Sequence, residues 1–187
     1  MSRLFDDGDS EYLSIDSVLG LSVLPICFSS WIYIDGQTGT NQAVMELVDK
    51  SEDDVRFLLY MNNTGTVYAL TQNAGGASQA ATTDTLTLNN WHHVLAVWAA
   101  TNDRRVYLNG GNKGTNVEER TVANLDRFSI AAHSGATPAL FLTGRVAEAA
   151  VWGGASLTDA DALVLSKGCS PLFVKRDNLV SYWPLIR

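Results

Sequence analysis

The sequence has few of the features that mark several large classes of protein. Its two cysteines, Cys27 and Cys169, are too few for a disulfide framework and leave open two free thiols or one bridge. It has no run of about 18 apolar residues, so we expect no membrane insertion. Its lysines and arginines are scattered over a chain of formal net charge −7, which argues against a nucleic-acid partner.

The first residues also lack a secretory leader. Phe5 is followed at once by Asp6 and Asp7, whereas an export signal needs an apolar stretch of roughly 7–15 residues. We therefore expect a protein without an export route, and the scarcity of cysteine fits a reducing cytoplasm.

What the chain does have is the composition of an ordinary globular protein: 187 residues, 46% of them hydrophobic and 18% charged. This length suits one β-sandwich, and the sequence shows no solenoid-type repeat and no low-complexity linker. We expect a single domain over residues 1–187.

Short β-type runs recur between clusters of Gly, Asn, Asp, Ser and Thr, a pattern typical of a sandwich or barrel. The predicted strands are residues 12–15, 26–34, 43–48, 56–61, 66–71, 85–88, 91–98, 105–108, 128–132, 139–143, 145–152 and 179–185. Residues 74–83, rich in small side chains, are predicted to form a loop. Asn109-Gly110 matches a two-residue hairpin turn, in which both central residues take positive φ.

One short helix is predicted near residues 158–168. Thr158 can cap its N-terminus, and Asp161 lies in the first turn, near the positive end of the helix dipole. Gly168 suits the C-terminal end, and Pro171 prevents the helix from continuing.

Four segments of the sequence, in this order, share a family pattern. They are Phe28 to Tyr33 (FSSWIY), Trp91 to Val94 (WHHV) followed by Arg105 to Gly110 (RVYLNG), Gly144 to Glu148 (GRVAE), and Leu179 to Leu185 (LVSYWPL). Together they resemble the laminin-G-like jelly-roll family of the concanavalin A-like superfamily. The resemblance implies an all-β, two-sheet antiparallel jelly-roll sandwich with the short helix at its margin. It does not imply one function, because this fold serves lectins, glucanases, adhesion modules and viral structural proteins.

Catalytic residues are not expected. Glucanases that share this fold carry a close E-x-D-x-x-E pattern on one strand, and this sequence has none. Glu148 stands alone late in the chain, so we interpret it as a structural acid. His92 and His93 are adjacent on a strand and therefore point to opposite faces, while His133 lies in a loop where we expect it to be solvated.

A metal site is not favoured either. Some relatives bind calcium through loop carboxylates, and calcium needs several oxygen ligands together. The densest acidic loop contains Asp49, Glu52, Asp53 and Asp54, which we interpret as a solvated turn. Ala147 stands where the family often has an aspartate. We therefore expect no cofactor, although the loop leaves calcium binding open.

Sugar binding needs an exposed aromatic side chain beside polar groups. All five tryptophans lie in predicted strands, where burial in the core is the default expectation. The candidate ligand-binding residues are therefore in polar loops, which also fit plain turn chemistry. They are Asn62, Asn63, Asn102, Asp103, Asn109 and Asn112.

Two functions remain from the sequence. The favoured one is a virion structural protein, such as a bacteriophage capsid decoration (cement) protein or a tail or fibre component. The alternative is a secreted or surface carbohydrate-binding or adhesion module. The favoured function predicts assembly in the host cytoplasm and a location on the virion surface. Its expected partners are capsid or other virion proteins, and host surface glycans are a further possible class of partner.

On the virion reading we expect a symmetric homo-oligomer, a trimer in particular. The chain ends are the candidate anchors to the particle, through Leu4, Phe5, Ile186 and Arg187. These residues equally fit the completion of edge strands.

Overall fold

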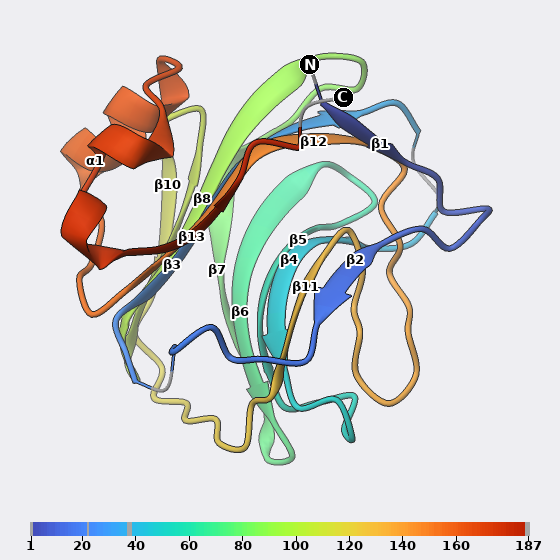
Figure 1. The fold of residues 1–187 in the computed structure, drawn as a ribbon, viewed down its shortest axis with the longest axis vertical. Coiled ribbons are helices and arrows are strands. Elements are labelled where there is room, and N and C mark those ends of the chain that lie inside the picture. The colour runs from blue at the N-terminus through green and yellow to red at the C-terminus, as the bar shows by residue number, and fades with distance from the viewer. Residues whose placement is uncertain (1, 22, 37–38, 186–187) are drawn as a thin grey trace.

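The computed structural model describes residues 2–21, 23–36 and 39–185, and its strands form two antiparallel sheets packed face to face (Figure 1). Sheet A has the order β1-β12-β3-β8-β9-β10, with β13 also paired to β12, and sheet B has the order β2-β11-β4-β5-β6-β7. The expected two-sheet jelly-roll sandwich is therefore confirmed. The strands of sheet A are β1 (Arg3–Phe5), β3 (Ile26–Ile34), β8 (Trp91–Ala100), β9 (Asp103–Leu108), β10 (Gly111–Asn116), β12 (Gly144–Gly153) and β13 (Leu179–Trp183). The strands of sheet B are β2 (Leu13–Ile15), β4 (Gln42–Val48), β5 (Arg56–Met61), β6 (Thr66–Asn73), β7 (Gly76–Thr85) and β11 (Arg127–Ile130).

The main core lies between the two sheets. Alternate residues of each strand point inward, and the aromatic ones among them meet at the centre. Phe28 of sheet A packs edge-on against Trp98 and against Phe128 of sheet B, with ring centroids 4.9 and 5.6 Å apart. Such contacts add to the free energy gained by burying the rings, so they hold the sheets together.

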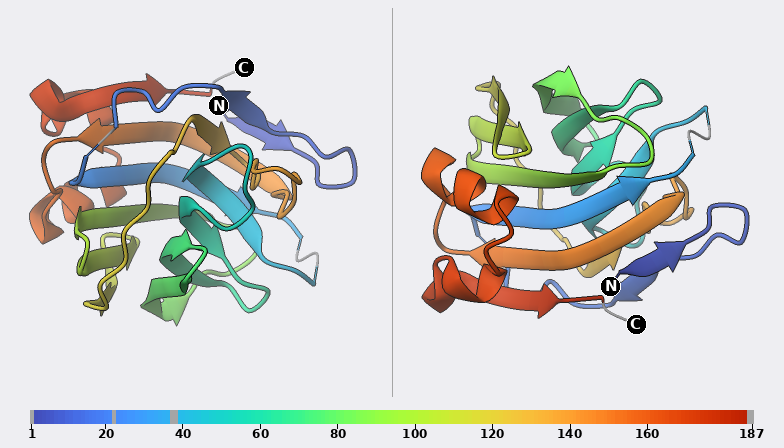
Figure 2. Two further views of the ribbon diagram at one scale, coloured as in Figure 1. Left: turned by 90° about the horizontal axis from the view of Figure 1, so that it is seen from below. Right: turned by 90° about the horizontal axis from the view of Figure 1, so that it is seen from above.

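The helix α1 (Asp159–Ser166) lies against the outer face of sheet A (Figure 2). Thr158 caps it, as the sequence predicted, and the structure adds that Asp161 completes a capping box. Its Leu165 is buried in a second core with Cys27 and Trp152 of the sheet. Two short 3-10 helices, η1 (Pro171–Phe173) and η2 (Arg176–Asn178), lead into β13. This second core occupies only one half of the outer face.

Among the residues that the structure describes, no helix is long and apolar enough to cross a membrane.

Three sequence predictions of local structure were wrong. Residues 74–83 were predicted as a loop, but most of them form the edge strand β7. Gly114 of β10 passes so close to the backbone carbonyl of Ala81 in this strand that no Cβ would fit at position 114. Residues 139–143 form no named strand, only an isolated bridge between Ala139 and His133. The strand predicted at 85–88 is absent, since β7 ends at Thr85.

Both cysteines are free. Cys27 is buried in the second core, and burial raises the pKa of its thiol to about 12. Its sulfur accepts the backbone N–H of Leu157 at 3.4 Å, so it behaves as a packing residue with a weak acceptor.

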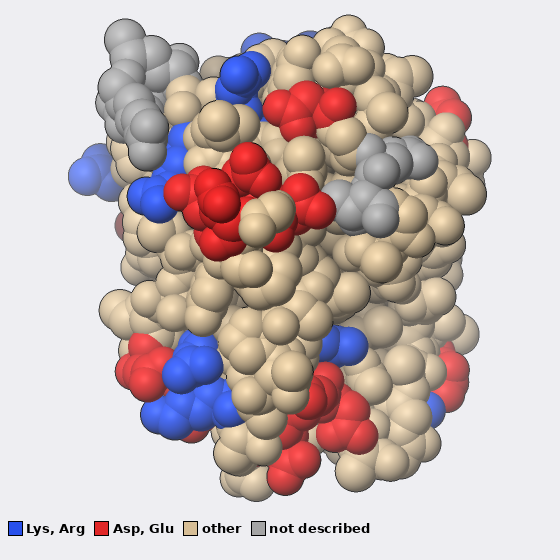
Figure 3. Space-filling model, turned by 90° about the vertical axis from the view of Figure 1, so that its right-hand side faces the viewer, with Lys and Arg blue, Asp and Glu red and all other residues tan. Residues whose placement is uncertain are grey.

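Charged side chains gather unevenly on the surface. The face shown in Figure 3 carries several clusters of acidic side chains, with basic side chains beside some of them. This distribution agrees with the formal net charge of −7. An anion approaching the molecule therefore meets a net repulsive field at long range.

Candidate functional site

The half of the outer face of sheet A that α1 leaves open carries aromatic side chains. Strand pairing places Trp31 of β3 opposite His93 of β8, and Tyr33 opposite Trp91. The ring centroids of these two pairs lie 5.5 and 5.7 Å apart. Trp91 is 41% exposed, while Trp31 and Tyr33 are half-buried. We call Trp31, Tyr33 and Trp91 the aromatic platform.

A hollow of about 290 Å3 opens on this platform, lined by Trp31, Trp91, Ala147 and Glu148. Ala147 of β12 pairs directly with Trp31. Because its side chain is a single methyl group, it leaves space between the larger side chains around it. We call this site the tryptophan hollow; it combines indole surface with one carboxylate.

A β-bulge brings that carboxylate to the hollow. Ala147 pairs with Trp31, but the next register pair joins Ala150 to Ser29, so β12 holds one extra residue. Strict alternation after Ala147 would turn Glu148 toward the core. Instead Glu148 takes φ +53°, a left-handed conformation that is uncommon for a residue with a side chain. Backbone strain of this kind is concentrated at functional sites in proteins.

The Glu148 side chain is held from the neighbouring strand. The Tyr182 hydroxyl of β13 donates to Glu148 Oε2 at 2.6 Å. Burial, and then this hydrogen bond, raises the pKa of Tyr182 to about 12, so the hydroxyl remains a donor. The sequence predicted a structural acid; the structure adds that its carboxylate lines a hollow.

His93 lies beneath the platform. Its Nε2 is 2.9 Å from Ser29 Oγ, and burial lowers the pKa of the ring to about 4. His92 points to the other side of the strand, where it contacts Asn109 and Thr87. The predicted divergence of the two histidines is therefore confirmed, and neither lines the tryptophan hollow.

Arg145 flanks the platform at its far end. Its guanidinium carbon lies 5.4 Å from the centroid of the Tyr33 ring, within the range of a cation–π interaction. Arg145 is not among the residues that line the hollow. It covers Tyr33, so the indoles of Trp31 and Trp91 are the aromatic surfaces left for a ligand.

The outer face of sheet B carries a second aromatic group. Tyr60 and Tyr68 stack with ring centroids 4.9 Å apart, and the Tyr60 hydroxyl donates to Gln79 at 2.7 Å. Tyr60 is only 7% exposed. Its ring surface is thus already used within the protein, and it offers a ligand less than Trp91 does.

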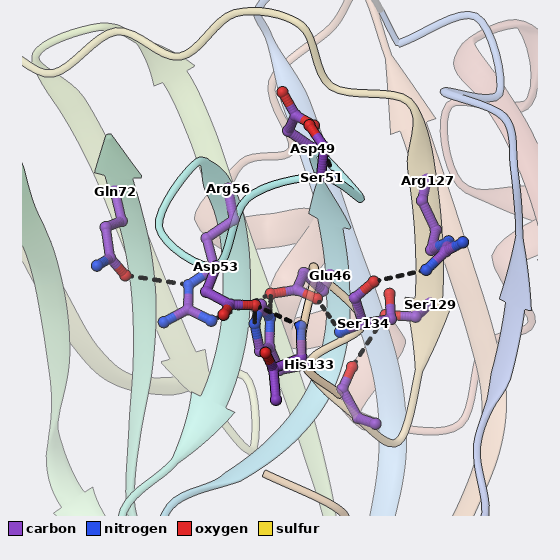
Figure 4. Close-up of polar contacts among 12 residues, drawn as sticks. Glu46, Asp49, Ser51, Asp53, Arg56, Gln72, Arg127, Ser129, His133 and Ser134 are labelled. Atoms are coloured by element: carbon purple, nitrogen blue, oxygen red, sulfur yellow. Dashed lines mark hydrogen bonds and ion pairs between the residues drawn. The ribbon is translucent and has the colours of Figure 1, made fainter. Parts of the chain in front are cut away.

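Beside these tyrosines is a buried polar network (Figure 4). Glu46 of β4 is fully buried, with Oε1 2.8 Å from His133 Nδ1 and 3.5 Å from Arg56 Nη1. Its Oε2 accepts the backbone N–H of Ser134 at 2.8 Å. His133 also lies 3.2 Å from Asp53 through Nε2 and is 4% exposed. The expectation that His133 is solvated was wrong, because two carboxylates hold it against sheet B.

The network fastens residues 131–143, which we call the covering loop, over sheet B. Asp53 accepts the backbone N–H of Thr137, and this hydrogen bond is the main cause that lowers the pKa of Asp53. The Ala43 N–H of β4 donates to Leu140 of the loop at 2.8 Å. The network thus has a structural task, and its carboxylates are already engaged.

Three other hollows offer a ligand less. One of about 90 Å3 is lined by Phe128 and the half-buried Trp183, but these two rings stack on each other, with centroids 5.2 Å apart, and the hollow has no charged side chain. A second, of about 420 Å3, is lined by Val55 and by the segments 73–75 and 121–124, which contain no aromatic residue. A third, of about 270 Å3, is mainly aliphatic, and its single aromatic residue, Phe57, is buried. These features make the tryptophan hollow the better candidate.

The loop residues proposed from the sequence are not brought together. Asn102 and Asp103 lie at the start of β9, while Asn109 and Asn112 follow its end. Asp103 pairs with Arg105, and Asn109 accepts the His93 backbone N–H at 3.0 Å. In the β5–β6 turn, Asn62 accepts the N–H groups of Thr64 and Thr66, and Asn63 is exposed. Their ligand-binding role stays a prediction.

The proposed anchors also differ in position. Phe5 is 1% exposed and belongs to the main core, whereas Leu4 is 44% exposed. Ile186 and Arg187 lie outside the described residues. Of the two N-terminal candidates, only Leu4 could therefore contact a partner directly.

The acidic turn at 49–54 mostly satisfies its own backbone. Asp49 accepts the N–H and the hydroxyl of Ser51. Within the described ranges of the chain, no group of three or more His, Cys, Asp or Glu residues is placed to hold a metal ion.

Comparison with known proteins places the fold. Residues 7–161 match a laminin G family described as the concanavalin A-like lectin/glucanases superfamily. The chain belongs to the concanavalin A-like lectin/glucanases superfamily. No curated protein sequence matches significantly. Membership of this superfamily confirms the family resemblance, and the match covers the first three of the four sequence segments. The phage-like aspect of the resemblance stays a prediction.

Solved structures of low sequence identity share the fold of this superfamily member. The CBM40 module of Ruminococcus gnavus IT-sialidase, solved with α2,3-sialyllactose, is 13% identical, with TM-score 0.70 over 83% of this chain and 96% of that one. Domains LG4-5 of the mouse laminin α1 chain are 13% identical, with TM-score 0.62 over 83% and 42%. A heptameric SAP-like pentraxin from Limulus polyphemus is 15% identical, with TM-score 0.62 over 86% and 77%.

Sequence reasoning missed Trp31 and Trp91 as site residues. Trp98 and Trp152 are buried as predicted, but Trp91 is exposed and Trp31 and Trp183 are half-buried. The alternation of β3 did place Trp31 and Tyr33 on one side. That side could have been recognised as open only by knowing how far the helix extends over it.

Proposed function

We propose that this protein is a non-catalytic carbohydrate-binding domain, and that the tryptophan hollow is its glycan site. The observation that carries the proposal is the meeting of two indoles and a carboxylate in one open hollow, with one carboxylate oxygen unpaired among the described residues. The C–H face of a pyranose is apolar and slightly positive, so it packs on the negative face of an indole. A few fixed polar groups then orient the sugar.

The comparisons support this function at the level of the fold. The matched superfamily is named for lectins and glucanases, and the R. gnavus module was solved with a bound sugar. The virion structural role predicted from the sequence has no such support, and it stays a prediction.

The non-catalytic part of the proposal rests on the content of the hollow. Glycoside hydrolysis commonly uses two carboxyl groups about 5–10 Å apart. The tryptophan hollow is lined by one, Glu148.

A glycan array followed by calorimetry tests the proposal. The protein is expected to bind a defined group of glycans, and Trp91→Ala is expected to weaken that binding at least about tenfold, or roughly 1.4 kcal/mol. Trp31→Ala should act in the same direction. Phe173→Ala is the matched control, because Phe173 is 81% exposed but lies in η1, away from the hollow.

Two results would overturn it. One is an array on which the folded protein binds no glycan. The other is that the Trp91→Ala variant binds the glycan as tightly as the Phe173→Ala control variant does.

A further inference from the structure

The polar group that the tryptophan hollow offers a ligand is an acceptor. Glu148 Oε2 receives the Tyr182 hydroxyl, whereas no hydrogen bond or ion pair engages Oε1 within the described part of the chain. An ionised carboxylate has no proton to donate, so Oε1 can hold only a group that brings its own O–H or N–H.

Glu148 is also the only charged residue among those that line the hollow. The half-buried indole of Trp31 replaces water on one side, so the field of the carboxylate is screened less than it would be at an open surface. A second carboxylate entering this space would be repelled by Glu148.

The basic side chain beside the aromatic platform, Arg145, does not make the inside of the hollow positive. Arg145 lies over Tyr33, beyond the lining residues. A ligand carboxylate that reached Arg145 would have to sit at the edge of the platform rather than between the two indoles.

The bulge fixes this arrangement in the backbone. Glu148 is the inserted residue of β12, with φ +53°, and its amide N–H donates to the Pro184 carbonyl at 3.3 Å. The carboxylate is therefore presented by a held backbone and by Tyr182, not by a free side chain on a loop.

We infer that the tryptophan hollow takes a neutral hexopyranose, which stacks on the indoles and donates hydroxyl protons to Glu148, and that it discriminates against glycans ending in an anionic sugar. This inference rests on the proposed function and names its ligand class. It sets this protein apart from the R. gnavus module, which was solved with a sialylated sugar.

The test compares neutral galactose-terminated glycans with their α2,3-sialylated counterparts on one array, for the full chain and for two variants. The wild type should bind the neutral member of each pair at least about tenfold more tightly. Glu148→Gln keeps the size of the side chain and one acceptor oxygen but removes the charge. It should therefore reduce the ratio of the affinity for the neutral glycan to that for the sialylated glycan several-fold. Arg145→Gln should leave the ratio unchanged. Thermal unfolding of each variant confirms that it is folded.

The outcomes separate the two claims. Equal or tighter binding of the sialylated members, especially if Arg145→Gln abolishes it, would overturn the inference while leaving glycan binding in place. An unchanged ratio of neutral to sialylated affinity in Glu148→Gln would also overturn the inference. Failure to bind either member of any pair counts against the proposed function itself.

Discussion

At the scale of single residues, Trp31 and Trp91 differ from Trp98 and Trp152 in what lies over them, not in the kind of strand that carries them. Trp98 points between the sheets, and Trp152 points outward but lies under α1. The outer face continues past the helix, and there the same alternation leaves Trp31 and Trp91 in contact with solvent. Sequence alternation therefore predicts the face of each tryptophan but not its exposure.

His93 gives a prediction at this scale. Burial lowers the pKa of His93 from 6.5 to about 4, and its Nδ1 has no hydrogen-bond partner among the described residues. The folded protein thus keeps the ring neutral in a range where the unfolded chain protonates it. The stability from this ring is complete above about pH 6.5 and is lost as the pH falls toward 4, by roughly 2–3 kcal/mol at pH 4.5.

Urea unfolding of the wild type and of His93→Gln at pH 7.0, 5.5 and 4.5 checks this. Between pH 7.0 and 4.5 the free energy of unfolding of the wild type should fall by more than that of His93→Gln. The carboxylates that titrate at lower pH are present in both proteins, so the extra loss in the wild type comes from His93. Parallel stability curves over this range would show that His93 does not carry the effect.

At the scale of elements, the sequence predicted most strands and the helix with its cap but missed features that depend on two elements meeting. β3 matches its predicted bounds, 26–34, because its bulky β-formers alternate clearly. β7 was missed because its small side chains show no hydrophobic alternation, and the close passage of Gly114 of β10 against its backbone is not visible in any local pattern. The Glu148 bulge was missed for a similar reason, since it is defined by register against β3.

A substitution at Gly114 tests the close passage of β10 against the backbone of β7. A Cβ at Gly114 would fall well inside van der Waals distance of the Ala81 carbonyl, which belongs to rigid backbone. Gly114→Ala should therefore lower the free energy of unfolding by about 1–3 kcal/mol or more. Gly111→Ala in the same strand is the control, because no atom lies within 4 Å of its Cβ position. Equal stability of the two variants in urea would refute the close passage.

The buried network predicts how the covering loop is held. Glu46→Gln removes the charge that faces His133 and Arg56, and should destabilise the protein by about 1–3 kcal/mol. Backbone amides of the loop, including that of Leu142, should then exchange hydrogen faster. Lys50→Gln, which removes the exposed ion pairs with Asp16 and Asp126, should change stability by less than about 1 kcal/mol. A Glu46→Gln effect no larger than that of Lys50→Gln would show that the network does not hold the covering loop.

At the scale of the whole molecule, the two outer faces of the sandwich are used differently. The covering loop and its polar network lie over part of sheet B, and α1 covers half of sheet A. What remains open on sheet A is the aromatic platform. The fold class could be predicted from four separated sequence segments, but the site could not, because it depends on which surfaces the helix and loop leave uncovered.

The most direct test of glycan binding at this place is a titration followed through the indole N–H signals of the five tryptophans by NMR. The probe is the neutral glycan that the array shows to bind most tightly, and single Trp→Phe variants assign the signals. The account predicts that the signals of Trp31 and Trp91 shift with the glycan, while those of Trp98 and Trp152 do not. Unmoved Trp31 and Trp91 signals, with the largest backbone shifts on β4, β5 and β6, would contradict it.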